Sequence, residues 1–174
     1  MNWPNRLSIL RVLCIPVIVL LLYLSAPWCR WAALTLFALA SFTDFLDGHL
    51  ARKNHWVTTF GKFIDPVADK LLVLSTLIML SYLRPVPAWM VILILARELS
   101  VDGLRMIAVS NGKVIAAGPL GKIKTASQMI LILAILLLRQ PLFSSPWGII
   151  AGVWICLITL WSGVDYFIRN RDVF

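Results

Sequence analysis

The sequence alternates long apolar runs with short polar stretches, and crossing a bilayer takes about 20 apolar residues of helix. The predicted spans are about Leu7–Ser25, Trp31–Gly48, Asp65–Leu83, Ala88–Ala108, Thr125–Leu138 and Trp147–Ile168. The fifth run is short, and the pattern does not fix its start. Prolines or a Gly-Pro pair mark several of the gaps, where a helix tends to end. The pattern therefore predicts an all-α integral membrane protein with six transmembrane helices.

The composition supports this class and argues against a water-soluble protein. Of the 174 residues, 60% are hydrophobic and 14% are charged, whereas soluble domains carry about 25% charged residues. One soluble core could not bury so much apolar surface. No separate soluble domain can be delimited, so residues 1–174 are expected to form a single transmembrane domain.

The positive charges predict an orientation in the membrane. The net charge is +8, with 16 Lys and Arg, and these residues mostly flank the apolar runs, which favours topology and anionic lipid over nucleic acid. With both termini cytoplasmic, that side holds Arg6, Arg11, Arg52, Lys53, Lys62, Lys70, Arg97, Arg105, Lys113, Lys122, Lys124, Arg169 and Arg171. The other side holds Arg30, Arg84 and Arg139. This bias predicts a protein of the cell inner or plasma membrane, with both termini facing the cytoplasm.

Negative charge is concentrated in the segment Thr43–Lys70, which holds four of the eight acidic residues. Asp44 and Asp47 are three residues apart, and Asp65 and Asp69 are four apart, so each pair shares a helix face. The short connection predicts that the two helices are antiparallel neighbours. Four carboxylates would then repel one another at the cytoplasmic membrane edge. Bound divalent cations would relieve this repulsion, and oxygen-only ligands favour Mg²⁺ or Mn²⁺.

Glycines beside the aspartates bear on the alternative reading of this segment. The aspartates could instead pair with the nearby Arg52, Lys62 and Lys70 in a solvated rim. A rim would not need Gly48 directly after the first pair, nor Gly61 one helical turn before the second. Both glycines remove side-chain bulk where the backbone could approach a ligand. The segment therefore favours a binding site.

The spacing of these residues resembles a known signature. The pattern is Asp44-x-x-Asp47-Gly48-x-x-Ala51-Arg52, then eight residues, then Gly61-x-x-x-Asp65-x-x-x-Asp69. It resembles the signature of the CDP-alcohol phosphotransferase family, with every signature position present at the family's spacing. The resemblance extends over most of the chain, because the family core also has six transmembrane helices.

The resemblance implies an enzyme that displaces CMP from a CDP-linked lipid with an alcohol, using two divalent cations. It implies that Asp44, Asp47, Asp65 and Asp69 hold the metals and that Asp69 is also the general base. Family members are commonly homodimers, and a homodimer is expected here on the same ground.

The resemblance also implies residues that bind CDP-diacylglycerol. Gly48, Arg52 and Thr58 match family positions that contact the CDP part, and Gly61 lies beside them. The stretch PNRLSILR near the N-terminus adds two candidates for the nucleotide pocket, Asn5 and Ser8. Simpler roles stay open for three of these residues: Asn5 as a helix cap, Arg52 as ordinary cytoplasmic charge and Thr58 as a loop hydroxyl.

A second group of charges bears on the identity of the acceptor alcohol. Arg97, Arg105, Lys122 and Lys124 offer more positive charge than one pyrophosphate needs, which suggests an acceptor that carries its own phosphate. The alternative is that some of these cations are neutralised locally by Glu98 and Asp102. The stretch from ARELSVDGLR to GKIKTASQ resembles the branch of the family that forms phosphatidylglycerophosphate from sn-glycerol 3-phosphate.

Other functions remain as alternatives. A sister enzyme could use inositol phosphate, serine or phosphatidylglycerol as its acceptor. A divalent-cation transporter would also place acids in a membrane, but its polar groups should cross the whole membrane depth. A lipid-binding scaffold without activity would not need a complete set of metal ligands. On helix six, Asp165 and Arg169 are expected to form a local ion pair across one turn.

Overall fold

The computed structural model describes residues 3–24, 26–53, 59–83, 86–113, 115, 118–138 and 142–171, and within them all side chains except those of 3–6, 44–53 and 59–66. The described residues contain no strand. They form six α-helices, α1 (Trp3–Tyr23), α2 (Pro27–Lys53), α3 (Thr59–Tyr82), α4 (Ala88–Ser110), α5 (Pro119–Leu137) and α6 (Pro146–Arg169), and a short 3₁₀ helix, η1 (Leu142–Ser144).

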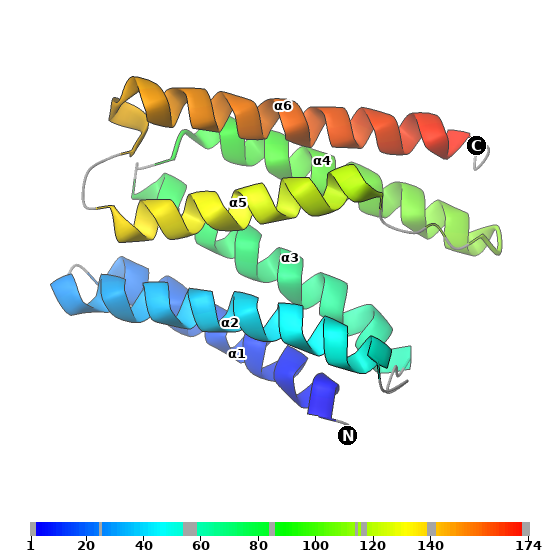
Figure 1. Ribbon diagram of the computed structural model, residues 1–174, viewed down its shortest axis with the longest axis horizontal. Coiled ribbons are helices and arrows are strands. Elements are labelled where there is room, and N and C mark those ends of the chain that lie inside the picture. Colours follow the sequence, from blue (N-terminus) through cyan, green and yellow to red (C-terminus); the bar gives the residue numbers. More distant parts are fainter. Residues whose placement is uncertain are drawn as a thin grey trace.

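The helices run alternately up and down one bundle, so α1 begins and α6 ends at the same end (Figure 1). Helix α1 packs against α2 and α3, and α6 packs against α4 and α5. We call α1–α3 the aspartate group and α4–α6 the cation group. Contacts of α3 with α4 and α5, and of α2 with α5, join the two groups. The common end of α1 and α6 is where sequence analysis placed the cytoplasmic site.

Each predicted span corresponds to one helix, but most of the helices begin earlier than predicted, and α1, α3 and α5 end one or two residues sooner. The largest differences are at two helix starts: α3 begins at Thr59 and not at Asp65, and α5 begins at Pro119 and not at Thr125. The first turns of α5 contain Gly121, Lys122 and Lys124 and were therefore not apolar enough to be included. Proline is well suited to the first helical position because its missing N–H is not needed there.

By hydropathy alone, only some of the six described α-helices qualify as membrane spans. Among the described residues, α5 and α6 are long and apolar enough to cross a membrane, and α1 contributes a shorter apolar stretch, Leu7–Tyr23. Helix α4 carries four charged residues over less than half its length, which lowers its mean hydropathy. The structure therefore supports a helical membrane protein.

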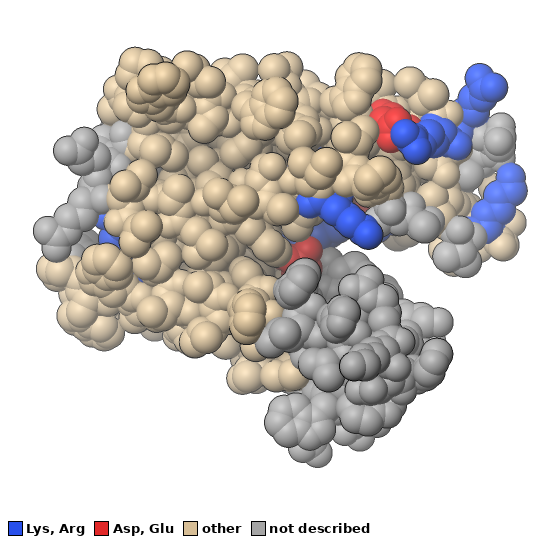
Figure 2. Space-filling model, in the orientation of Figure 1, with Lys and Arg blue, Asp and Glu red and all other residues tan. Residues whose placement is uncertain are grey.

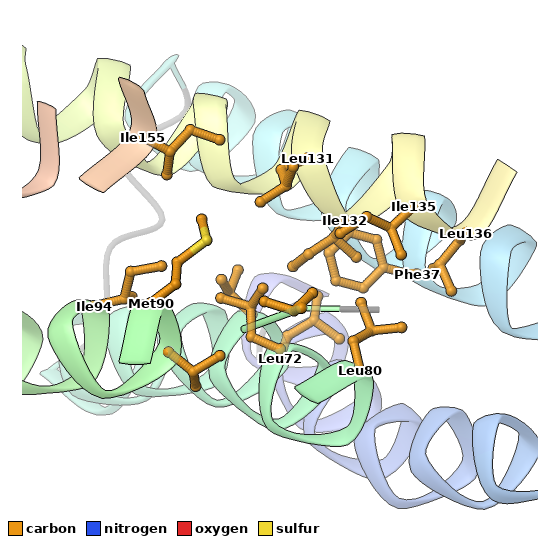
Figure 3. Close-up of a cluster of buried hydrophobic side chains, with 14 of the residues drawn as sticks. Phe37, Leu72, Leu80, Met90, Ile94, Leu131, Ile132, Ile135, Leu136 and Ile155 are labelled. Carbon is orange, nitrogen blue, oxygen red and sulfur yellow. The ribbon is translucent and has the colours of Figure 1, made fainter. Parts of the chain in front are cut away.

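The core lies where the two groups meet (Figure 3). It includes one side chain from each of five helices: Phe37 of α2, Leu72 of α3, Met90 of α4, Ile132 of α5 and Ile155 of α6. All five are at most 5% exposed. In a bilayer, lipid is as apolar as these side chains, so close packing holds the helices together more than the exclusion of water does.

Arg30 links the aspartate group to the cation group through hydrogen bonds, at the end of the bundle opposite the aspartates. Its Nε donates to the carbonyl of Leu136 at 2.7 Å, and its Nη2 donates to the carbonyls of Ile135 and Leu138, the first at 2.6 Å. These carbonyls belong to the last turn of α5, where they lack partners within the helix. A cation there also interacts favourably with the helix dipole. Arg30 of α2 is thus a cap for α5.

Candidate functional site

The predicted metal ligands lie on two neighbouring helices. Asp44 and Asp47 are in the second half of α2, and Asp65 and Asp69 are in the first half of α3. Helices α2 and α3 contact one another, and their antiparallel course brings these four positions to the same end. The Asp69 side chain is half-buried, and the other three aspartate side chains lie outside the described set.

The chemistry of these four positions fits a hard divalent cation. Aspartates spaced by three residues on α2 and by four on α3 offer only carboxylate oxygens, which Mg²⁺ and Mn²⁺ prefer. Within the part of the chain whose side chains are described, no other group of His, Cys, Asp or Glu could hold a metal ion. The four aspartates on α2 and α3 remain the predicted metal ligands.

Most residues predicted to bind the CDP part cannot be compared with the structure. Thr58 lies outside the described residues, as do the side chains of Asn5, Arg52 and the two glycine positions 48 and 61. Ser8 is described and is 2% exposed. It lies on α1, which packs against both aspartate-bearing helices. These assignments remain predictions.

A buried ionic cluster joins α3, α4 and α5, and we define it as Lys70, Arg97, Glu98, Asp102 and Lys124. At its centre the Glu98 carboxylate pairs with Lys124, and both side chains are 5% exposed. Oε1 of Glu98 is 3.3 Å from Nη1 of Arg97, and its Oε2 is 3.8 Å from Nζ of Lys70. Lys70 also pairs with Asp102, which is more exposed. One carboxylate thus contacts cations from three helices.

Helix α6 fixes the direction of Arg97. Nη2 of Arg97 donates to Oγ of Ser162 at 2.9 Å, and that hydroxyl donates to the carbonyl of Thr159 at 3.1 Å. The next residue, Gly163, leaves room for the arginine, because a Cβ there would lie 3.1 Å from its Cγ. The Arg97 guanidinium is therefore held between Glu98 and α6.

A small cavity lies between the ionic cluster and Asp69. Its volume is about 40 Å³, enough for ordered water. Its lining comes from three helices and comprises Asp69, Lys70, Val73, Leu74, Glu98, Lys124, Thr125 and Gln128. A carboxylate suited to accepting a proton and two ammonium groups suited to binding phosphate therefore border the same space.

The surface in Figure 2 shows where charge gathers on one face of the bundle. Most of its blue and red lies toward the end where α6 finishes, and the described surface beyond it is almost entirely tan. Large apolar side chains are exposed along every helix, for example Leu20, Leu39, Ile78, Ile92 and Trp161. A bilayer would cover this apolar surface, and the charged end would face the head groups and water.

Comparison with known sequences assigns the family. Residues 1–162 match the family described as CDP-alcohol phosphatidyltransferase. The chain belongs to this family. The resemblance stated from the aspartate signature is thereby confirmed. Enzymes of this family use divalent cations, in agreement with the carboxylate donor set on α2 and α3.

Curated relatives match over nearly the whole chain. A protein of Bacillus subtilis (strain 168) is 42% identical over 98% of this chain and 96% of its own length. A protein of Rickettsia bellii is 42% identical over 99% and 97%, and one of Pseudomonas fluorescens is 39% identical over 95% and 88%. All three are named CDP-diacylglycerol–glycerol-3-phosphate 3-phosphatidyltransferase.

The four basic residues expected to bind acceptor phosphate in this CDP-alcohol phosphatidyltransferase occupy different environments. Glu98 brings Arg97 and Lys124 together. Arg105 lies two turns farther along α4, about 10 Å away, where its Nε donates to the Tyr166 hydroxyl at 2.9 Å and its guanidinium stacks on the ring. Lys122 is exposed in the first turn of α5. Local neutralisation by acids, left open by the sequence, holds for Arg97 and Lys124.

Sequence reasoning assigned no substrate-binding or positioning role to several residues of this region. Lys70 and Gln128 line the cavity, while Ser162 and Tyr166 of α6 hold two of the arginines. Gln128 follows Lys124 by four residues, so helical spacing could have found it. Nothing in the apolar α6 sequence singles out its serine or tyrosine as a partner of α4. The expected pair of Asp165 with Arg169 is confirmed, with Nε and Oδ1 2.7 Å apart.

Proposed function

We propose that this protein transfers the phosphatidyl group of CDP-diacylglycerol to sn-glycerol 3-phosphate, giving phosphatidylglycerophosphate and CMP. The observation that carries the proposal is the complete family signature, with its two aspartate pairs on adjoining helices. Two features support the choice of acceptor: the names of the relatives, and a cavity that Asp69 shares with two lysines. An acceptor that carries a phosphate needs a carboxylate to take its hydroxyl proton and cations to bind its phosphate.

Asp44, Asp47, Asp65 and Asp69 are proposed to hold two divalent cations, Mg²⁺ or Mn²⁺. When bound, these ions would offset the charge of the pyrophosphate and of the departing CMP. The aspartates' own part is to bind and orient the ions from two helices. Because α2 and α3 contact one another, the four carboxylates would enclose the ions from both sides.

Asp69 is proposed to act as the general base. The 1-hydroxyl of glycerol 3-phosphate attacks the phosphorus next to diacylglycerol, a new P–O bond forms, and the P–O bond to CMP breaks. The hydroxyl proton passes to a carboxylate oxygen of Asp69. The half-buried position of Asp69 beside the cavity supports this role, because an acceptor held by the cations there would lie within its reach.

The remaining predicted residues are proposed to bind the two substrates. Donor contacts are assigned to Asn5, Ser8, Gly48, Arg52, Thr58 and Gly61. Acceptor-phosphate contacts are assigned to Arg97, Arg105, Lys122 and Lys124. The structure supports a division among the second set, since Arg97 and Lys124 are buried around Glu98 whereas Lys122 is exposed.

All six helices are proposed to span the membrane as one domain of residues 1–174, with termini and active site on the cytoplasmic side. Asp69 is 13 residues from the end of α3 at Tyr82, and Lys124 is 13 residues from the end of α5 at Leu137. At 1.5 Å per residue, both lie about 20 Å from the far ends of their helices. In a hydrocarbon core about 30 Å thick, the site would then lie in the cytoplasmic leaflet.

This depth explains how two dissimilar substrates could meet. The donor's diacylglycerol would stay in lipid while its phosphates reach the aspartates, and the acceptor would arrive from the cytoplasm. Two copies of the chain are proposed to form a homodimer, by the family resemblance. The exposed apolar residues along each helix are compatible with either lipid or a second copy as a neighbour.

The experiment that tests the function uses purified protein in lipid nanodiscs. CDP-diacylglycerol is supplied with Mg²⁺ or Mn²⁺ and, in separate reactions, sn-glycerol 3-phosphate, inositol phosphate, serine or phosphatidylglycerol. We expect CMP release and phosphatidylglycerophosphate formation only with the first acceptor, and loss of both in excess EDTA. Turnover with serine alone would overturn the acceptor assignment. Metal uptake into proteoliposomes without CMP release would favour a transporter.

A further inference from the structure

The Glu98 carboxylate contacts three cations. Its side chain is 5% exposed and meets Lys124, Arg97 and Lys70, which come from α5, α4 and α3. With Asp102, the ionic cluster has three cations and two carboxylates. These five residues alone carry one positive charge in excess, and the Asp69 carboxylate on the same cavity is proposed to be offset by metal, so the cluster can still attract an anion.

The cations of this cluster need an anchor because they repel one another. The ammonium groups of Lys70 and Lys124 stand on flexible stems, and with water largely excluded their repulsion is poorly screened. The Glu98 carboxylate lies between them, hydrogen-bonded to Lys124 and paired at 3.8 Å with Nζ of Lys70. Arg97 is held from the other side by Ser162. Glu98 thus keeps the three cations at one place.

We propose that Glu98 is a positioning residue that holds Lys124, Lys70 and Arg97 in place for the acceptor's phosphate. This inference rests on the proposed function. Glu98 does not touch the reacting atoms and acts through the lysines and the arginine. Its carboxylate keeps the cationic wall assembled before the acceptor arrives, which reduces the ordering that binding would otherwise require.

The proposal predicts a change in the acceptor KM that is opposite in sign to the change expected from charge attraction alone. If Glu98 were only a negative neighbour of the site, removing its charge would draw the anionic acceptor in and lower its KM. If Glu98 positions the cations, the same change lets them separate and raises the acceptor KM. The sign of the change in KM therefore distinguishes the two roles.

The test measures full-length Glu98→Gln in nanodiscs, with each substrate varied in turn. We expect the KM for sn-glycerol 3-phosphate to rise about tenfold or more, because a charge-assisted hydrogen bond is lost. The KM for CDP-diacylglycerol should change less than about twofold, since the donor does not depend on this contact. Glu98→Asp keeps the charge on a shorter stem and should recover part of the acceptor affinity. Asp165→Asn, an acid on the surface of α6, is the matched control and should behave as wild type.

A double variant separates positioning from general damage. If Glu98 acts through Lys124, Glu98→Gln combined with Lys124→Met should raise the acceptor KM little beyond Lys124→Met alone. Fully additive effects, or an acceptor KM that is unchanged or lower in Glu98→Gln, would overturn the proposal. If Glu98→Gln cannot be purified folded, an unchanged acceptor KM in Glu98→Asp overturns it instead. Failure of the proposed function would show separately, as absence of turnover in the wild-type protein.

Discussion

The aspartate group and the cation group differ in whether their charged side chains are paired within the protein. On α2 and α3, four acidic positions of one sign are brought to the same end of the bundle. On α4 and α5, acids and bases are already paired, with Glu98 between Lys124 and Arg97. The first arrangement calls for cations from solution, whereas the second is nearly balanced within the protein. The first side is therefore the one proposed to take up metal, and the second can stay assembled without a ligand.

Lys70 belongs to both arrangements. It follows Asp69 on α3, yet its ammonium group pairs with Asp102 and approaches Glu98 on α4. The cavity lies where these side chains meet. The proposed metal side and the proposed phosphate side are thus linked through adjacent residues of one helix, so a change on either side should leave a distinct kinetic signature.

The largest effect is expected on the aspartate side. Asp69→Asn removes the proposed base and one metal ligand and should lower kcat by about 10³-fold or more, because general bases contribute about 10²- to 10⁴-fold. CDP-diacylglycerol binding should remain, since three carboxylates still hold metal. Turnover assays together with equilibrium binding of labelled donor measure the two quantities. Appreciable activity in this variant would remove Asp69 as the base.

On the cation side, two lysines two residues apart form a matched pair. Lys124→Met should raise the KM for sn-glycerol 3-phosphate about 30-fold, because a buried ammonium group is lost next to Glu98. Lys122→Met, on the exposed first turn of α5, should raise it about threefold or less, since water and salt screen that charge. Steady-state kinetics at constant ionic strength compare them. Equal effects would contradict the division between buried and exposed cations.

Removing the charge of Arg105 should raise the acceptor KM by an amount between those expected for the two lysine variants. Arg105→Gln should raise the acceptor KM about tenfold with little change in kcat, because one charged contact to phosphate is lost. Tyr166→Phe keeps the stacked ring but removes the hydroxyl that accepts from Nε of Arg105, and it should cost only about threefold. Acceptor titrations of both variants test this order. An unchanged KM in Arg105→Gln would exclude Arg105 from the acceptor pocket.

The smallest effect concerns stability and separates the two groups directly. Saturating Mg²⁺ or Mn²⁺ should raise the melting temperature of the wild type by about 5 °C, because an ion that binds only the folded state stabilises it. Asp47→Asn should lose most of this shift, and Glu98→Gln should keep it. Thermal unfolding followed with and without EDTA measures the difference. A shift lost equally in both variants would mean that the metal site and the ionic cluster are not separate.

A feature could be predicted from the sequence when it depends on residues that are close together in the chain. The helices and the aspartate pairs depend on spacing within consecutive segments, so apolar runs and the intervals 44–47 and 65–69 were enough. The start of α5 was missed because two lysines lie in its first turns. The partners of Arg97 and Arg105 were missed because Ser162 and Tyr166 are more than sixty residues away. Such contacts depend on the packing of α4 against α6, which no local pattern specifies.

The cap that Arg30 forms on α5 has a consequence at the far end of that helix. Since Arg30 holds the terminal carbonyls of α5, it fixes how far the helix can slide along its own axis. A slip of one turn would carry Lys124 by about 5.4 Å, well beyond the reach of Glu98. A residue at the opposite end of the bundle thus sets the axial register of a lysine that is proposed to meet the substrate.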